Sequence, residues 1–350
     1  MPQLHPRLLA LALLATLLLP ACTSLGPRHF ATWQVDTPAD TATLSTPSPD
    51  HIDFHGIPVR SGQIVVSEQG SPLGLLMSLL IADASPWIHA GIVSIEDGVP
   101  YLYESNGQIR PTWSNPPTTA VRGGVRRLSL DWFVANQSFI AIYTPPAGAD
   151  PAQIVEFARE AYARQVPFDA WFDLDDPSRM YCTEFVALAL AAGDAPPVRS
   201  SAVNQNPSIR VIANWLQVRA DRLIPAGAVI THSDRVALIS KQHSPAQFMA
   251  YLALQRELHR RFTPDQKIGN VLSFSMPGGL RFRAPVRDLI RSVERAARDW
   301  GTLDEAEIDA HVRQLAVDIL GPWSPKWNRG QTGIPLEKPW SGPDFSAQTN

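Results

Sequence analysis

The chain has 350 residues, of which 45% are hydrophobic, and its formal net charge at pH 7 is −3. This composition is ordinary for a globular protein with a buried core, and the length allows one large domain or two modest ones. Because the net charge is small and no basic stripe is visible, nucleic acid is not an expected partner.

Residues 1–21 have the layout of a secretory signal peptide, in which the apolar run Leu8–Leu19 follows a positive residue. This run is shorter than the roughly 20 residues that span a bilayer. It leads into Leu19–Cys22 (LPAC), which resembles the lipobox of bacterial lipoproteins, where cleavage precedes a lipidated cysteine. The alternative is an ordinary signal peptide beside a chance cysteine. We expect lipidated Cys22 to anchor an exported protein to a bacterial membrane, and Thr23 favours the periplasmic face of the outer membrane.

Residues 22–50 contain Cys22 and a stretch rich in Thr, Pro, Ser and Asp, which predicts a flexible tether. The chain has two cysteines. If Cys22 is lipidated, Cys182 has no partner for an intramolecular disulfide. A lone thiol in an oxidising compartment is either a buried, inert side chain or a reactive one.

Residues 51–240 mix short strands and helices, which predicts an α+β domain. Strands are expected at 63–67, 89–95, 101–104 and 139–143, helices after Ser71-Pro72, after Asp150-Pro151 and at 182–192 before Gly193, and a final hairpin at 228–232 and 235–239.

Residues 241–322 have helical periodicity and are expected to form a helical C-terminal extension. Helices are predicted to begin at Pro245, at Pro285 and after a capping box formed by Thr302 and Glu305. Residues 323–350 are rich in Pro and Trp, which predicts an extended tail. The sequence assigns no function to the extension or to the tail.

Cys182 is expected at the first turn of its helix. The unpaired N–H groups and the positive end of the helix dipole favour a thiolate there. The backbone N–H of Cys182 itself can also donate to a developing oxyanion. These are requirements for a nucleophilic cysteine, although the placement alone is not specific.

A nucleophilic cysteine needs a base, and His89 is the best candidate among the nine histidines. It opens an apolar strand beside Gly91, and Glu104 lies near the end of the next strand. If these strands pair around Asp97-Gly98, His89 and Glu104 are near neighbours, and a carboxylate there can orient the imidazole. The alternatives are a hydrogen-bonded core histidine and a solvated glutamate at a strand end.

Four segments resemble the permuted papain-like amidases, the YiiX-like branch of the NlpC-type cell-wall hydrolase superfamily. In this branch the histidine strand precedes the cysteine helix, as it does here. The matching segments are Trp87–Val93 (WIHAGIV), Tyr103–Glu104, Pro167–Asp169 (PFD) and Tyr181–Val186 (YCTEFV). The resemblance covers roughly residues 55–235, and Gln63 stands where the family commonly has aspartate.

The resemblance implies a circularly permuted papain-like domain whose antiparallel sheet packs on the cysteine helix. It also implies Cys182 as nucleophile, His89 as base and then acid, and Glu104 as the residue that orients His89. Tyr181 and Asp169 are possible lining residues of the site, and Glu184 is expected to be structural. No cofactor is implied.

We therefore expect a cysteine hydrolase that cleaves peptide amides of the cell-wall type through a thioester. Two alternatives remain open: a lipid-acyl thioesterase or acyltransferase, and a non-catalytic envelope-binding lipoprotein. A metal site at His51, Asp53 and His55 is disfavoured because this short motif lacks a fuller ligand set. No phosphate loop or dinucleotide fingerprint is present.

Overall fold

The computed structural model describes residues 33–36, 51–68, 77–81, 85–107, 123–206, 209–210, 213–214, 218, 220–241, 244–262, 271–275 and 279–322. The signal peptide at 1–21, Cys22 and the tail at 323–350 lie outside these residues, so the predictions for them stay untested. Within the described ranges, no helix is long and apolar enough to cross a membrane.

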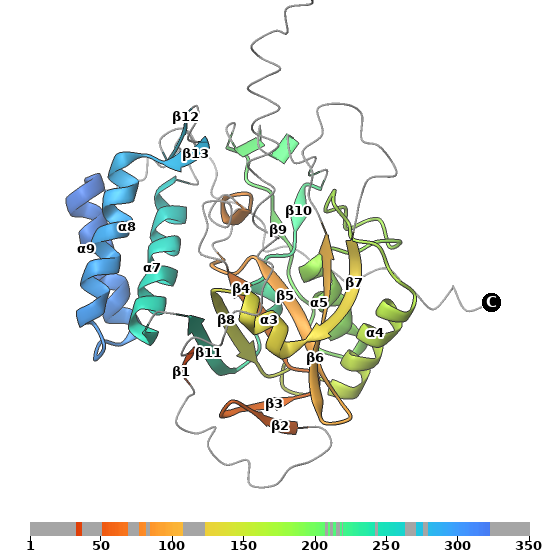
Figure 1. Cartoon of the computed structure of the whole chain (residues 1–350). Helices are drawn as coiled ribbons and strands as arrows, with labels where there is room; N and C mark the ends of the chain where they lie inside the picture. Colours follow the sequence, from red (N-terminus) through yellow and green to blue (C-terminus); the bar gives the residue numbers. More distant parts are fainter. Residues whose placement is uncertain are drawn as a thin grey trace, which may run out of the picture.

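The centre of the fold is a seven-stranded sheet in which all neighbouring strands are antiparallel (Figure 1). With the helices around it, this sheet confirms the predicted α+β class. Its strands, in spatial order, are β1 (Trp33–Asp36), β11 (Arg235–Lys241), β8 (Phe139–Tyr143), β4 (Ile64–Glu68), β5 (His89–Glu96), β6 (Val99–Gly107) and β7 (Gly123–Ser129).

The predicted hairpin of β5 and β6 is confirmed. Its two turn residues, Asp97 and Gly98, both have positive φ angles, 51° and 77°. This conformation matches the twist of a two-residue hairpin and favours glycine at the second position. The turn fixes the pairing of Ile92 with Tyr103, and therefore the face on which every later residue of β6 lies.

Helices cover both faces of the sheet. α4 (Pro151–Ala163) and α5 (Cys182–Ala192) pack on one face, and α3 (Leu130–Asn136) packs on the other (Figure 1). The strand side chains alternate accordingly: Ile92 packs toward α5, and Val93 packs toward α3.

The helices at α4 and α5 have the predicted ends. Asp150 caps α4 by accepting hydrogen bonds from the N–H groups of Ala152 and Gln153, at 2.8 and 3.4 Å. Gly193 ends α5 and donates its N–H to the Ala189 carbonyl at 3.2 Å. Of the helix expected after Ser71-Pro72, residues 77–81 are described: 77–79 are helical, but Leu80 lies in a turn and Ile81 forms an isolated bridge with Val203, so the helix ends earlier than predicted.

The hairpin predicted at 228–232 and 235–239 is wrong. Ala228–Ile230 forms a short 3-10 helix, η3, which follows a turn closed by the Ala228 N–H and the Pro225 carbonyl. Residues 235–239 do lie in β11, but β8 and β1 occupy its two edges, so no edge remains for residues 228–232. β1 also shows that the expected tether contains a paired strand.

Three two-stranded sheets flank the main sheet. They are β2 (His51–Phe54) with β3 (Ile57–Arg60), β9 (Ser201–Ala202) with β10 (Arg222–Leu223), and β12 (Leu272–Ser275) with β13 (Gly279–Phe282). The last pair lies within the C-terminal extension, which is therefore not helical throughout.

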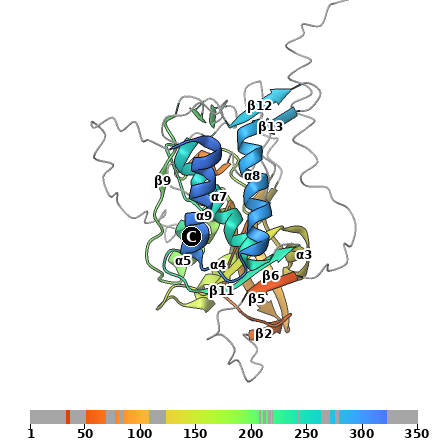
Figure 2. The same cartoon turned by 90° about the vertical axis from the view of Figure 1, so that its left-hand side faces the viewer.

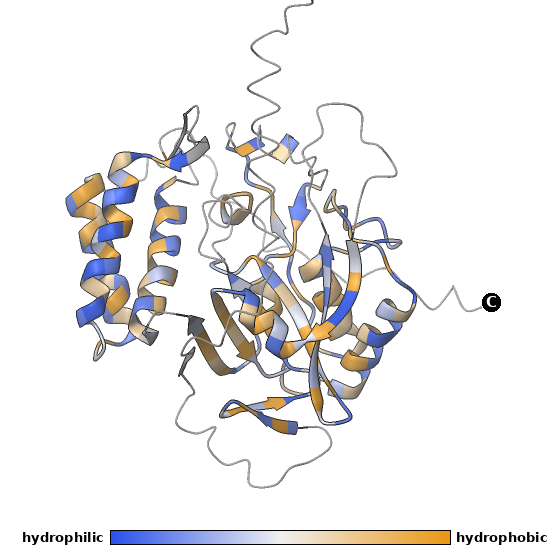
Figure 3. Ribbon diagram, viewed as in Figure 1, coloured by the Kyte–Doolittle hydropathy of each residue, from blue (hydrophilic) through white to orange (hydrophobic). Residues whose placement is uncertain are grey.

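The extension is otherwise built from α7 (Pro245–Phe262), α8 (Ala284–Ala296), the 3-10 helix η5 (Ala297–Asp299) and α9 (Glu305–Leu320). Figure 2 shows the three α-helices side by side, and Figure 3 shows that each mixes hydrophobic and hydrophilic residues. The capping box of α9 is made by Asp304 and Glu307, not by Thr302 and Glu305, because the helix begins at Glu305.

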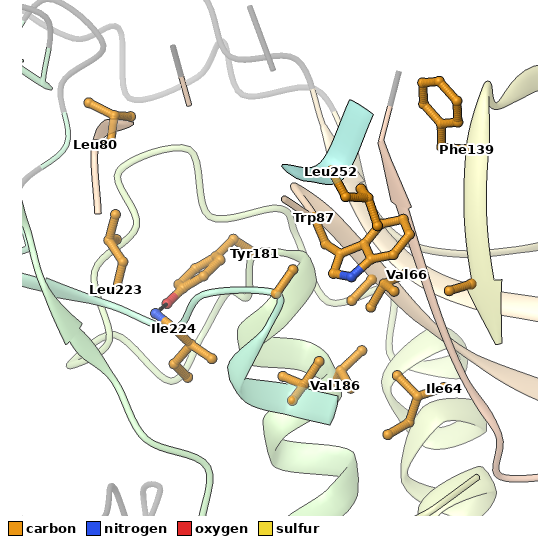
Figure 4. Packing of buried hydrophobic residues seen from close by; sticks show 14 of the residues in the cluster. Ile64, Val66, Leu80, Trp87, Phe139, Tyr181, Val186, Leu223, Ile224 and Leu252 are labelled. Carbon is orange, nitrogen blue, oxygen red and sulfur yellow. Dashed lines mark hydrogen bonds between the residues drawn. The ribbon is translucent and has the colours of Figure 1, made fainter. Parts of the chain in front are cut away.

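Aromatic stacking joins the extension to the main sheet. The buried Phe248 ring of α7 stacks on Phe139 of β8, with a centroid separation of 4.5 Å, and meets the Trp87 ring edge-on at 5.7 Å. Figure 4 shows the Trp87 side chain beside Leu252 of α7, and both residues belong to the same buried cluster as Phe139. Because Trp87 lies two residues before His89, α7 supports the segment that leads into β5.

We predict that Phe248→Ala lowers the free energy of unfolding by about 3–5 kcal/mol, because it leaves a cavity between the extension and the sheet. Denaturant unfolding of the full chain measures this loss. The partly exposed Val317 of α9 offers a control: Val317→Ala should change stability by less than about 0.5 kcal/mol. Equal effects of the two substitutions would contradict the packing role of Phe248.

Candidate active site

Cys182 is the first residue of α5. Its Sγ lies 3.9 Å from the carbonyl oxygen of Ile88, so the start of the helix lies beside the start of β5. Its backbone N–H belongs to the first turn, where N–H groups have no partner within the helix. The thiol and this N–H therefore lie together beside the start of β5.

The two residues that flank Cys182 are both bound to the backbone of Ile224. The Tyr181 hydroxyl accepts the Ile224 N–H at 2.9 Å, drawn as a dashed line in Figure 4, and the Thr183 hydroxyl donates to the Ile224 carbonyl at 2.6 Å. Both side chains are buried. A segment more than forty residues away in the chain thus fixes the backbone on either side of the thiol.

The His89 ring lies between Cys182 and Glu104. Its Nε2 is 2.5 Å from the Glu104 Oε2, and Cys182 is close enough to the ring for its charge to raise the pKa of His89. Because Nε2 is engaged by the carboxylate, Nδ1 is the ring nitrogen left for the thiol. The ring centroid is also 6.1 Å from that of Phe133 of α3.

Gly91 lets β6 pack closely against β5 beside the site. Continuing the β5–β6 register by one residue from the pair Ile92–Tyr103 places Gly91 opposite Glu104. A Cβ atom at position 91 would lie 2.8 Å from the Tyr103 carbonyl oxygen and 3.0 Å from the Leu102 side chain. Without that atom, the β6 backbone and the Leu102 side chain can lie close to β5, next to the diagonal pair of His89 and Glu104.

Glu104 itself is fully buried, whereas 17% of the His89 side chain is exposed. Its Oε1 accepts hydrogen bonds from the Arg126 Nε at 2.7 Å and from the Asn106 Nδ2 at 3.3 Å. Arg126 also places an Nη2 group 2.5 Å from Oε1. The buried carboxylate is therefore surrounded by donors from three adjacent strands.

These contacts set the protonation states. Burial alone would lower the pKa of His89, but the negative charges of Glu104 and of a Cys182 thiolate outweigh it and raise this pKa to about 10. Burial alone would raise the pKa of Glu104, but His89 and Arg126 outweigh it and lower this pKa to about 2. At neutral pH the pair is an imidazolium and a carboxylate.

The remaining predicted residues hold the chain around the cysteine. The buried Asp169 carboxylate accepts the backbone N–H groups of Trp171, at 2.9 Å, and Asp173, so it organises its own loop. Glu184 accepts the Tyr181 N–H at 3.3 Å. Burial, with the nearby Asp169 charge, raises the pKa of Glu184 to about 9, which favours the neutral acid.

Two further features were not predicted from the sequence. Arg126 lies on β7, for which no strand was predicted. The Ile224 backbone, which binds Tyr181 and Thr183, was missed because no side chain in the sequence indicates such a contact. The Gln63 side chain accepts the Arg60 N–H at 2.9 Å and donates to the Pro58 carbonyl at 3.3 Å.

The histidines at 51 and 55 do not form a metal centre with Asp53. The Asp53 carboxylate accepts the Gly56 N–H at 2.8 Å, and the His55 Nε2 lies 3.0 Å from the Asp131 carboxylate. In the part of the chain that the structure describes, no three His, Cys, Asp or Glu side chains are arranged to hold a metal ion.

No protein-family model and no curated protein matches the chain. Among solved structures, the chain is similar to the metalloprotein YiiX from Escherichia coli O157:H7, with 15% identity and a TM-score of 0.40 over 50% of this chain and 95% of that one. At this level of similarity we draw no conclusion about the chemistry of this chain.

The His89–Glu104 pair predicts a pH dependence of stability. Because the pKa of His89 rises from 6.5 to about 10 on folding, its stabilisation is complete below pH 6.5 and is lost as the pH rises toward 10. We expect the difference in unfolding free energy between the wild type and His89→Gln to shrink over this range. Denaturant titrations at several pH values measure it.

The exposed His232 supplies the control, since His232→Gln should leave the pH dependence of stability unchanged. A wild-type advantage over His89→Gln that stays constant between pH 6.5 and 10 would contradict the ion pair.

Proposed function

We propose that this protein is a cysteine-dependent hydrolase that cleaves an amide or ester through a thioester intermediate. The observation that supports this most directly is the His89 ring, which contacts a buried, ionised carboxylate and whose pKa responds to a thiol at a helix N-terminus. A buried carboxylate that shifts the pKa of a histidine beside a cysteine is an arrangement that clusters at catalytic sites.

In the first half of the proposed reaction, the Cys182 thiolate attacks the carbonyl carbon of the substrate and forms a C–S bond. The Cys182 backbone N–H donates to the oxygen on which negative charge develops. The His89 imidazolium then gives its proton to the departing nitrogen or oxygen as the bond to the carbonyl carbon breaks. The products of this half are a thioester on Cys182 and a neutral imidazole.

In the second half, the neutral His89 ring takes a proton from water, and the resulting hydroxide attacks the thioester carbonyl. The C–S bond breaks, its electron pair returns to sulfur as thiolate, and the carboxylic acid is released. His89 is again an imidazolium. Glu104 keeps its charge throughout and holds Nε2, so that Nδ1 always faces the sulfur.

We further propose that the domain is a circularly permuted papain-like fold and that the substrates are peptide amides of the cell-wall type. The order of the histidine strand and the cysteine helix in the chain supports the fold proposal. The LPAC sequence at Leu19–Cys22 supports export and lipid anchoring, which would place the enzyme at the periplasmic face of the outer membrane.

We predict that Cys182→Ala abolishes hydrolysis while the fold is retained, because the nucleophile is removed from a partly exposed position. Purified murein peptides and short-chain p-nitrophenyl esters are the two substrates to compare, with the circular dichroism spectrum as the fold control. Turnover of the esters alone would favour a lipid-acyl enzyme. Turnover that survives Cys182→Ala would overturn the hydrolase proposal.

We also predict that His89→Ala raises the pH at which iodoacetamide alkylates Cys182, because the imidazolium that stabilises the thiolate is lost. Alkylation rates between pH 5 and 10, followed by mass spectrometry, measure the shift. His232→Ala is the matched control and should leave the profile unchanged. A profile that is the same in the wild type and His89→Ala would show that the two side chains are not a functional pair.

A further inference from the structure

Glu104 has a second cationic partner besides His89. Its direct cross-strand neighbour is Arg126 of β7, whose Nε and Nη2 both lie within 2.7 Å of Oε1. His89 contacts the other oxygen, Oε2. The two cations thus divide the carboxylate between them, one on each oxygen.

This division has a consequence for the proposed reaction. When His89 has given its proton to the leaving group, the ring is neutral, and its charge no longer offsets that of Glu104. A fully buried carboxylate without a cation tends to take up a proton. A protonated Glu104 would no longer accept strongly from Nε2, and the ring would lose its orientation just before it must activate water.

We propose that Arg126 is a positioning residue, which keeps the Glu104 carboxylate ionised and aimed at the His89 Nε2 while the imidazole is neutral. This inference rests on the proposed function. Arg126 suits the role because its guanidinium is permanently charged and its paired donors fix the orientation of the carboxylate.

When the His89 ring is neutral, Arg126 is the cation that remains beside Glu104. The charged and titratable groups that act on the carboxylate are His89 from β5 and Arg126 from β7, while Cys182 from α5 acts through the His89 ring. Asn106 on β6 adds an uncharged donor. From α3, the Trp132 ring lies 5.9 Å from the Arg126 guanidinium and flanks it, and Asp131 is engaged by His55.

The neighbouring arginine provides a matched control. Arg127 is the next residue of β7 and also pairs with a glutamate, with its Nη1 2.5 Å from the Glu96 Oε2, and it stacks on Tyr101 at 4.1 Å. This network lies at the turn end of the β5–β6 hairpin, away from His89. Arg127→Gln therefore removes an equivalent ion pair without touching Glu104.

We predict that Arg126→Gln moves the acidic limb of the Cys182 alkylation profile to higher pH by about one pH unit or more, because Glu104 then takes up a proton more readily and His89 loses its partner. Iodoacetamide is the probe, and the full chain is used. Arg126→Lys, which restores the charge but not the paired donors, should shift the profile less, and Arg127→Gln should leave it unchanged.

The outcomes separate this inference from the proposed function. If His89→Ala shifts the alkylation profile but Arg126→Gln does not, Arg126 has no positioning role and the hydrolase proposal stands. If neither variant shifts the profile, the thiol–imidazole pair itself is absent and both proposals fail. Should Arg126→Gln not fold, Arg126→Met removes the same charge and takes its place: a profile that superimposes on that of the wild type overturns the inference, and a shifted one supports it.

Discussion

The site depends on one costly feature, the burial of a charged carboxylate. Glu104 has no exposed surface, and water cannot stabilise its charge. The protein compensates with His89 on one oxygen and with Arg126 and Asn106 on the other. Because each partner comes from a different position of the sheet, the compensation holds only if β5, β6 and β7 keep their register. The chemistry proposed for Cys182 follows from this pairing.

Residues outside the site hold these strands and the start of α5 in place. The Asp97-Gly98 turn sets the pairing of β5 with β6, and Gly91 lets the β6 backbone and the Leu102 side chain pack closely against β5. On the opposite side of the thiol, Tyr181 and Thr183 fix the first turn of α5 to Ile224. The extension contributes through Phe248, which packs against Trp87 just before His89.

Local signals in the sequence predicted much of this arrangement. The Asp97-Gly98 turn, the Asp150 cap and Gly193 at the end of α5 each act within a few residues, so their effects can be inferred without the fold. The same reasoning made His89 and Glu104 near neighbours, because a hairpin register follows from its turn. The proximity of Cys182 to this pair came from the family resemblance, not from any local signal.

Long-range pairing could not be predicted in the same way. Ser233-Asp234 is a plausible turn, but β11 pairs with β8 and β1, which come from distant parts of the chain. β7 gave no strand signal, so Arg126 was missed, although it is the direct neighbour of Glu104. The contacts of the Ile224 backbone with Tyr181 and Thr183 were missed because every residue has a peptide group, and the sequence does not show which one will bind. Such contacts depend on the topology and not on local composition.

The central claim is that the buried carboxylate keeps His89 protonated beside the thiol of Cys182. Nitrogen NMR of the histidine rings, titrated in the wild type and in Glu104→Gln, tests it most directly, since the ring shifts report protonation at each nitrogen. The account predicts that His89 is an imidazolium at pH 7–8 in the wild type and loses its proton near pH 10, whereas in Glu104→Gln it does so at clearly lower pH. A wild-type His89 ring that is already neutral at pH 7–8 would contradict it.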